Sequence, residues 1–584
     1  MSISHEKQEP QSSARLGAGI FIGVFLLGLV LRLIALDQHP LSETEAHLAL
    51  QAYALAQGQS VPDLAGQPGY LLPTALAFFL LGAREATARF WPALWGILVV
   101  GLPWLLRRQL GQPLAILLAL GLALDAGLVA TSRLATADSL ALWSLLGLIT
   151  FAWRREWRLA GIALALGVLS GASFWLGALI LGATWGFWRW IEGSLEVDVP
   201  ETPYSLYGVS LNGSIPWPRL AISALVAFFL LGSGLGIVGR GLGAAATGLV
   251  EFLRGWAAQG TTSPGLLGMA LLVYQPLGWV LALGQWMRGW RRMSPLARLS
   301  TLWLGVGVIL LAVYPGRQVS HLIWVLVPLW ILAASTLTQW LGGLREIERT
   351  SLLVVATAYF VLLGYLWLNL EGLVPGNVDP QWIWVRGLAF LGAVLLGVAL
   401  WLVVGWSWGM QVSRQGLFWG GTVFLGLLAF SATWQAAGLG RAPSAQIWGS
   451  QPYVAEEDLL LKTLEDVSEW VTGRRDAVDI RVVGIESEAL RWALRRFYHA
   501  EFVQTLPPLE TPSVVITSEV AMPGVSALYR GQDFVWRETS DWSLFLPGEW
   551  LSWIIYRKAP LQRQAIVVWV RADRFPQVVN LTNP

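Results

Sequence analysis

A succession of apolar runs, each close to the length that crosses a lipid bilayer, dominates the sequence. The first covers residues 16–36, and others follow at about 88–106, 113–131, 139–153, 159–174, 176–190, 220–238, 265–287, 297–313, 322–341, 351–370, 385–405 and 416–437. A helix of ~20 apolar residues spans the hydrocarbon core. Of all residues 55% are hydrophobic and 13% are charged, whereas soluble chains are about 25% charged. We therefore predict an α-helical polytopic membrane protein with about thirteen transmembrane helices.

Arginine clusters indicate the direction in which these spans run, because cytoplasmic loops are rich in Lys and Arg. If the N-terminus is inside and the short apolar run 70–82 lies on the membrane, the inside loops hold Arg107, Arg108, Arg154, Arg155, Arg158, Arg288, Arg291, Arg292, Arg345, Arg349 and Arg414. An odd number of spans then places the C-terminal part outside. We expect a cytoplasmic tail (1–15), a transmembrane domain (16–438) with interfacial helices within 37–87 and 239–263, and an extracytoplasmic domain (439–584) in the cell envelope.

The composition changes after residue 440, where charges return and apolar runs shorten. Segment 456–472 is typical of an amphipathic helix, 481–485 of a strand, 487–500 of a helix and 512–518 of a second strand. Residues 552–556 and 565–571 are strand-like as well. This order predicts a small α/β domain built around a βαβ unit. The basic face formed by Arg491, Arg495 and Arg496 is expected to be solvated.

Several classes of chemistry are excluded by the residues present. The chain has no Cys, which rules out disulfides and thiolate metal sites, and it has five His. It contains no Walker loop, HExxH zinc motif or nucleophile elbow. The balance of 39 basic and 37 acidic residues gives no reason to expect a nucleic-acid partner. A transporter is disfavoured because the spans carry few charges, although Asp125 stands inside one of them.

The first outside loop is the richest in chemistry. Glu43, Glu45 and His47 follow directly after the first span. A carboxylate there could act as a base or hold a divalent cation, with Glu45, His47 and Asp138 as possible ligands. The alternative is helix capping, with Ser42 or Thr44 as N-cap and Glu in the first turn.

Cationic residues at the same predicted membrane face could bind a phosphate. Arg133 precedes Asp138 in the second outside loop, and Arg317 and His321 begin a later span. Arg89 lies near the start of the second span. Arginine suits phosphate because its fork of donors matches the oxygens. The alternatives are a structural ion pair, capping by Asp138, and snorkelling of Arg at the interface.

The order of these motifs resembles that of the GT-C membrane glycosyltransferases. The similarity is to the branch of protein mannosyltransferases and lipid A aminoarabinose transferases, and especially to its flippase-associated archaeal and bacterial proteins. It is carried by His39-Pro40 through Glu45 and His47, by Gly82, Glu85 and Arg89, by Ser132, Arg133 and Asp138, and by the run 321–334 (HLIWVLVPLWILAA). The motifs cover residues 17–155 well and the remainder loosely.

The resemblance implies transfer of a sugar from a polyprenyl-phosphate donor to an extracytoplasmic protein, lipid or glycan, by an inverting enzyme. It assigns catalysis to Glu45, Glu43 or Asp138, and donor-phosphate binding to Arg133, Arg317, His321 and Arg89, in some relatives with a divalent cation. The sequence departs from the family where Thr44 replaces the Asp of the acidic pair, and where Gly66-Gln67-Pro68 replaces His-Gly-Pro. The alternative is therefore a catalytically degenerate membrane subunit that binds lipid or scaffolds partners in a larger membrane-protein complex.

Overall fold

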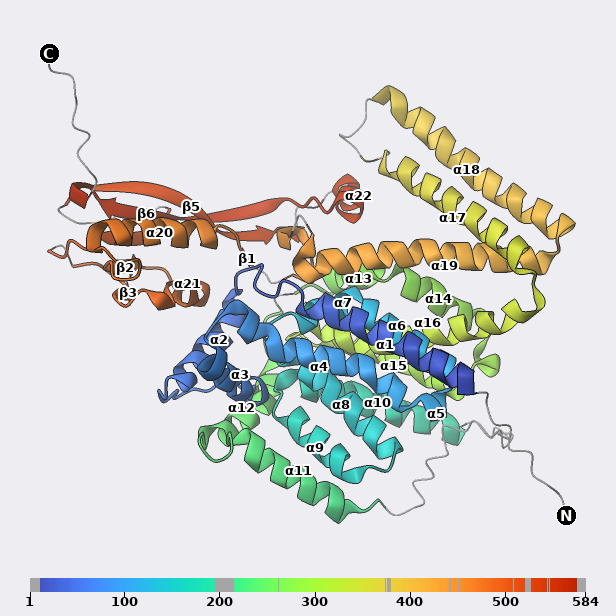
Figure 1. The fold of residues 1–584 in the computed structure, drawn as a ribbon, viewed down its shortest axis with the longest axis horizontal. Helices are drawn as coiled ribbons and strands as arrows, with labels where there is room; N and C mark the ends of the chain where they lie inside the picture. Colours follow the sequence, from blue (N-terminus) through green and yellow to red (C-terminus); the bar gives the residue numbers. More distant parts are fainter. Residues whose placement is uncertain are drawn as a thin grey trace.

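Figure 1 shows the computed structural model, a bundle of long helices that carries a mixed β-sheet at one end. The structure describes residues 11–194, 215–260, 262–372, 374, 380–440, 443–449, 452–507, 509–519, 527–542, 545 and 547–574. Residues 1–10 of the expected N-terminal tail lie outside the described residues, whereas residues 11–15 already belong to the first helix.

The bundle contains nineteen α-helices within the described residues. They are α1 (Gln11–Leu33), α2 (Glu43–Ala56), α3 (Pro68–Leu81), α4 (Glu85–Leu105), α5 (Arg107–Leu110), α6 (Gln112–Leu124), α7 (Ala126–Ser132), α8 (Asp138–Trp153), α9 (Trp157–Val168), α10 (Ala172–Ser194), α11 (Trp217–Gly232), α12 (Arg240–Gly255), α13 (Pro264–Tyr274), α14 (Pro276–Trp286), α15 (Pro295–Val313), α16 (Ile323–Gly342), α17 (Arg349–Glu371), α18 (Pro380–Ser407) and α19 (Met410–Trp434).

Seven helices of the described residues are long and apolar enough to cross a membrane, and up to nine spans result if each of two bent pairs counts as one. The helices α3, α8, α9 and α11 are apolar but shorter. The chain is a multi-pass membrane protein. These helices do not confirm the predicted number of about thirteen spans.

Two predicted spans are broken helices. α6 and α7 meet at 61°, and α13 and α14 meet at 86°. Asp125 caps α7, because its Oδ1 accepts a hydrogen bond from the Leu128 amide at 2.8 Å. Its Oδ2 accepts from the Trp330 indole at 2.6 Å. Pro276 opens α14 and lacks the N–H that would continue α13. The apolar run of the sequence continues through both breaks, so periodicity alone does not predict them.

Two arginines of the predicted inside loops make contacts between helices. Arg154 donates to the Leu105 carbonyl at 2.8 Å, which joins the end of α8 to the end of α4. Arg288 donates to the Gln339 side chain, which joins α14 to α16. Each contact thus joins an arginine of a predicted inside loop to a neighbouring helix, and the direction of the spans across the membrane stays a prediction.

The C-terminal part is a six-stranded mixed sheet. Its strands are β1 (Tyr453–Val454), β2 (Ile480–Val483), β3 (Ala500–Val503), β4 (Val514–Ser518), β5 (Tyr529–Ser540) and β6 (Leu561–Arg571), in the order β1-β5-β6-β4-β2-β3. β2 is parallel to β3 and to β4, and the other pairs are antiparallel. The helices here are α20 (Glu457–Thr472), α21 (Glu488–Ala493) and α22 (Pro547–Tyr556). The predicted α/β class and the parallel β2–β4 pair are confirmed.

Three details of that prediction are wrong. Residues 552–556 belong to α22, whose Trp553 is fully buried against the helical bundle. The predicted helix 487–500 ends at Ala493, because the chain then makes a tight turn into β3. Arg495 is not solvated, since its side chain is 6% exposed and its Nη2 lies 3.3 Å from Glu85 Oε1.

Candidate functional site

Glu45, a predicted catalytic carboxylate, is buried and fully engaged by the chain itself. Ser42 is the N-cap of α2, and Glu45 closes a capping box with it. Glu45 Oε2 accepts from the Ser42 amide at 3.1 Å and from the Ser42 hydroxyl at 3.0 Å. Its Oε1 accepts from the Ala135 amide at 2.9 Å. The capping interpretation of this segment is therefore confirmed.

Arg89 is the ionic partner of Glu45. Its Nε donates to Glu45 Oε1 at 2.9 Å and its Nη2 to Oε2 at 3.1 Å, so the pair is bidentate. The remaining donors bind the carbonyls of Leu36 at 3.0 Å, His39 at 2.7 Å and Pro40 at 2.9 Å. All five N–H groups of the guanidinium are used. Arg89 therefore holds the first outside loop against α4.

The electrostatics of the pair weaken Glu45 as a base. Burial alone would raise the pKa of the Glu45 carboxyl, but Arg89 and the amides of Ala135 and Ser42 outweigh burial and hold the pKa below its ordinary value. A carboxylate in this state takes a proton poorly.

Arg133 is buried without a carboxylate partner among the described residues. Its Nη1 donates to the carbonyls of Leu31 at 3.2 Å, Arg32 at 3.3 Å and Ile34 at 2.7 Å, and its Nη2 to that of Ala35 at 3.0 Å. It thus caps the C-terminal end of α1, and its Nε makes no hydrogen bond within the described chain. Burial, and then the neighbouring Arg89, lower the pKa of Arg133 to about 10. An anion beside it would relieve both effects.

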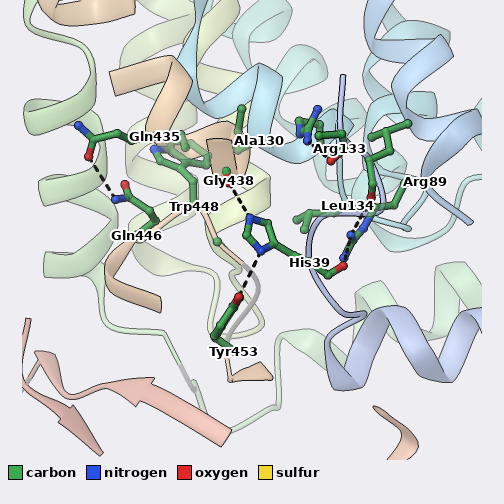
Figure 2. A pocket seen from close by; sticks show the side chains of 15 residues that line it. His39, Arg89, Ala130, Arg133, Leu134, Gln435, Gly438, Gln446, Trp448 and Tyr453 are labelled. Carbon is green, nitrogen blue, oxygen red and sulfur yellow. Dashed lines mark hydrogen bonds between the residues drawn. The ribbon is translucent and has the colours of Figure 1, made fainter. Parts of the chain in front are cut away.

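Figure 2 shows the cavity that Arg133 lines, about 60 Å³ in volume. Arg89, His39 and Tyr453 face it from other elements. The Nε2–H of His39 donates to the Gly438 carbonyl at 2.5 Å, and its Nδ1 accepts from the Tyr453 hydroxyl at 3.2 Å. Burial lowers the pKa of His39, and the two arginines lower it further. The cavity therefore favours an anion.

Sequence reasoning missed five polar or aromatic residues of this cavity. They are His39, Gln435, Gln446, Trp448 and Tyr453. Four of them lie near the end of α19 or at the start of the sheet domain, about 400 residues from the first outside loop. His39 carries a weak signal, since it is one of five histidines and follows the first span closely.

Asp138 and His321 form a second predicted set. Asp138 opens α8, is half-buried, and accepts from the Thr136 hydroxyl at 3.0 Å. His321 is buried within electrostatic range of Asp138, and its Nδ1 accepts from the Gln318 amide at 3.2 Å. No basic side chain of the described residues forms an ion pair with Asp138. Asp138 is thus the candidate carboxylate with the least internal engagement.

Glu43 lies at the junction with the sheet domain. Its Oε1 accepts from the Ser487 hydroxyl at 2.6 Å and from Arg537 Nε at 3.0 Å, and its Oε2 from the Ala489 amide at 3.1 Å. Burial would raise the pKa of Glu43, but Ser487, Ala489 and Arg537 outweigh burial and lower it. Glu43 therefore fastens α21 to α2.

Of the predicted site residues, Arg89 and Arg133 line the cavity, and Glu43, Glu45, Asp138, His321, Arg317 and His47 do not. Arg317 donates to the carbonyls of Thr262 at 2.8 Å, Ala312 at 3.1 Å and Tyr314 at 3.0 Å. His47 is exposed, 3.1 Å from the Gln51 amide nitrogen. Thr44 is also exposed.

The proposed cation ligands do not fit a metal in this arrangement. Glu45 already accepts five hydrogen bonds, two of them from Arg89. His47 is exposed and Asp138 accepts from Thr136. The part of the chain that the structure describes contains no group of three His, Asp or Glu side chains that could hold a metal ion.

Comparison with known proteins identifies the fold. No protein-family model and no curated protein sequence matches the chain. The crystal structure of ArnT from Cupriavidus metallidurans bound to undecaprenyl phosphate matches with a TM-score of 0.52 at 13% identity, over 96% of this chain and 98% of ArnT.

Two weaker matches accompany it. They are ArnT from Cupriavidus metallidurans in the apo state (TM-score 0.47, 15% identity, 95% of this chain and 98% of that one) and the apo oligosaccharyltransferase of Archaeoglobus fulgidus (TM-score 0.39, 14% identity, 83% of this chain and 64% of that one). The match to lipid-bound ArnT extends over almost the whole of both chains, so this chain has the fold of the GT-C protein ArnT.

Proposed function

We propose that the protein transfers a sugar from a polyprenyl-phosphate donor to an acceptor at the end of the bundle that carries the sheet domain. The main support is Arg133, a buried cation that has no carboxylate partner among the described residues and faces a cavity with Arg89 and His39. A charged guanidinium in such a place favours an anionic ligand. The ArnT structure of the same fold contains undecaprenyl phosphate.

In this proposal Asp138 acts as the base. It takes the proton of the acceptor O–H or N–H while that heteroatom attacks the anomeric carbon of the sugar. The bond from that carbon to the phosphate oxygen breaks, and the lipid phosphate leaves with the electron pair. Arg133 stabilises the charge that develops on the leaving phosphate. Attack from the face opposite the leaving group inverts the anomeric centre.

His321 is within electrostatic range of Asp138 and is a positioning residue in this scheme. Glu45 and Glu43 support the site without touching substrate, because both are saturated by the chain. The proposal keeps the predicted orientation, with the N-terminus cytoplasmic and the sheet domain extracytoplasmic.

A second candidate is a catalytically degenerate subunit that binds the lipid carrier within a membrane-protein complex. Exposed Thr44 at the family's Asp position favours it, together with the structural engagement of Glu45. Both candidates predict lipid binding, and only the first predicts transfer.

Binding of undecaprenyl phosphate to the purified full chain tests the shared step, for example by native mass spectrometry. We expect Arg133→Gln to weaken binding about tenfold, since a hydrogen bond to a charged group is worth about 1.5–3 kcal/mol. The matched control is Arg158→Gln, an exposed arginine at the start of α9 that does not line the cavity. Ala130→Leu, which fills the cavity, should act like Arg133→Gln. Equal binding of undecaprenyl phosphate by the unmodified chain and the three variants would contradict the phosphate site.

A further inference from the structure

A second cleft opens at the same end of the molecule, separate from the cavity of Figure 2. It is lined from the sheet domain by Glu465 of α20, residues 474–476 and residues 495–498, and from the helical bundle by Tyr53 of α2 and Ala83. Its volume is about 690 Å³, against about 60 Å³ for the cavity beside His39. Sites for small ligands measure about 300–1,000 Å³. None of the site residues predicted from sequence lines it.

The cleft is rich in arginine. Arg474, Arg475, Arg495 and Arg496 line it, with Glu465 and Asp476 as the acidic residues. Arg474 pairs with Asp476 at 3.2 Å and Arg475 with Glu469 at 3.0 Å, and these two arginine side chains are 66% and 70% exposed. Exposed ion pairs contribute only about 0–1 kcal/mol. An incoming anion can therefore replace these carboxylates at little cost.

The other two arginines differ in role. Arg495 forms part of the wall, because its Nη2 donates to the Ala83 carbonyl at 3.0 Å and to Glu85. Arg496 is exposed and makes no hydrogen bond or ion pair within the described part of the chain. Its five donors remain available to a ligand with carboxylate or phosphate oxygens.

Aromatic side chains add a second kind of surface. Tyr498 is 75% exposed, and Tyr53 of α2, which also lines the cleft, is half-buried. A tyrosine ring offers an apolar face with a polar tip, which suits the C–H face and the hydroxyls of a sugar ring. Arginines beside one exposed and one half-buried tyrosine fit an acidic saccharide better than a bare inorganic anion.

The cleft is connected to the candidate site through α4. Glu85 binds Arg495 across the cleft wall, and it precedes Arg89 by one turn of α4. A saccharide in the cleft would thus lie next to the helix that holds the first outside loop.

We infer that this cleft binds an acidic saccharide, one that carries carboxylate or phosphate groups. The assignment of that saccharide as the acceptor of the transferred sugar rests on the proposed function.

Calorimetry on the full chain in detergent tests the inference with two probes of equal length, tetragalacturonate and the neutral maltotetraose. We expect tetragalacturonate to bind at least about tenfold more tightly, and added salt to weaken it. Arg475→Gln with Arg496→Gln should weaken tetragalacturonate about tenfold or more and leave maltotetraose unchanged. Tyr498→Ala should weaken both saccharides. Arg563→Gln, an exposed arginine on β6 outside the cleft lining, is the matched control.

The inference fails if tetragalacturonate does not bind, if maltotetraose binds equally well, or if the double variant behaves like the control. It also fails if phosphatidylglycerol vesicles bind through these arginines and tetragalacturonate does not compete, since the partner is then a lipid surface. Undecaprenyl phosphate binding is measured in parallel. Its absence in the unmodified chain would count against the proposed function alone and leave the saccharide site standing.

Discussion

Glu45 and Arg89 form a buried bidentate ion pair, with Nε 2.9 Å from Oε1 and Nη2 3.1 Å from Oε2. Their side chains are 2% and 7% exposed, respectively. The pair joins the first outside loop to α4, and Ala135 of the second outside loop donates to the same carboxylate. The residue that motif similarity favours for catalysis therefore determines the architecture of the site.

Glu45→Gln should destabilise the protein by about 3–5 kcal/mol, because Arg89 is left buried without its counter-charge. Thermal unfolding in detergent measures the change. Thr44→Ala, one residue earlier and exposed, should stay within about 0.5 kcal/mol. If Glu45→Gln unfolds like the unmodified protein yet loses activity, the structural role assigned to Glu45 is wrong.

Gly438→Ala should distort the cavity. Gly438 has φ +76°, and an added Cβ would lie 2.7 Å from Cδ2 of His39. We expect a loss of about 1–3 kcal/mol of stability and weaker binding of undecaprenyl phosphate. Gly426→Ala on α19 meets nothing within 4 Å and should be neutral or stabilising. Equal binding of undecaprenyl phosphate by the two variants would show that His39 is not part of the lipid site.

The pair of Glu43 with Arg537 should couple the sheet domain to α2. A double-mutant cycle with Glu43→Gln and Arg537→Gln should give about 1 kcal/mol, since both side chains are partly exposed. Hydrogen exchange of residues 488–493 reports the coupling. The pKa of Glu43 is lowered when docked, so this contribution is present above its ordinary value of 4.5 and is lost as the pH falls below it. Additive effects of the two substitutions would refute the coupling.

The contribution of Glu457 to the stability of the protein should have the opposite pH dependence. Burial, and then Glu85, raise the pKa of Glu457 to about 8. The raised pKa means that stability is fully present below 4.5 and falls as the pH rises through 8, by up to about 1.4 kcal/mol per pH unit. Glu457→Gln should remove this fall in thermal unfolding curves. Asp466→Asn, exposed on the same helix, should retain it; an unchanged slope in Glu457→Gln would contradict the assignment.

The sequence predicts the elements of this fold better than the contacts of its site. Apolar runs place α4, α15, α16 and α19 within a few residues at most positions. The sequence pattern does not predict the breaks at Asp125 and before Pro276, because each depends on capping or on proline geometry inside an apolar run. The run 552–556 predicts a strand but belongs to α22, since a short apolar run fits either the helical or the strand period.

Some contacts of the site can likewise be predicted from the sequence, and others cannot. Ser42 followed three residues later by Glu45 is a capping signature that sequence can recognise, and the structure has it. The partner of Glu43 is Arg537, almost 500 residues away, and no local pattern encodes that contact. The same holds for Tyr453 opposite His39.

Transfer itself tests the central claim most directly. Undecaprenyl phosphate carrying tritiated mannose or aminoarabinose is offered to the purified chain with tetragalacturonate or an envelope extract as acceptor. We expect label in the acceptor, and a fall of about 100-fold or more in Asp138→Asn, which should still bind undecaprenyl phosphate. Lipid binding without transfer in the unmodified chain, or full transfer by Asp138→Asn, would contradict the proposed mechanism.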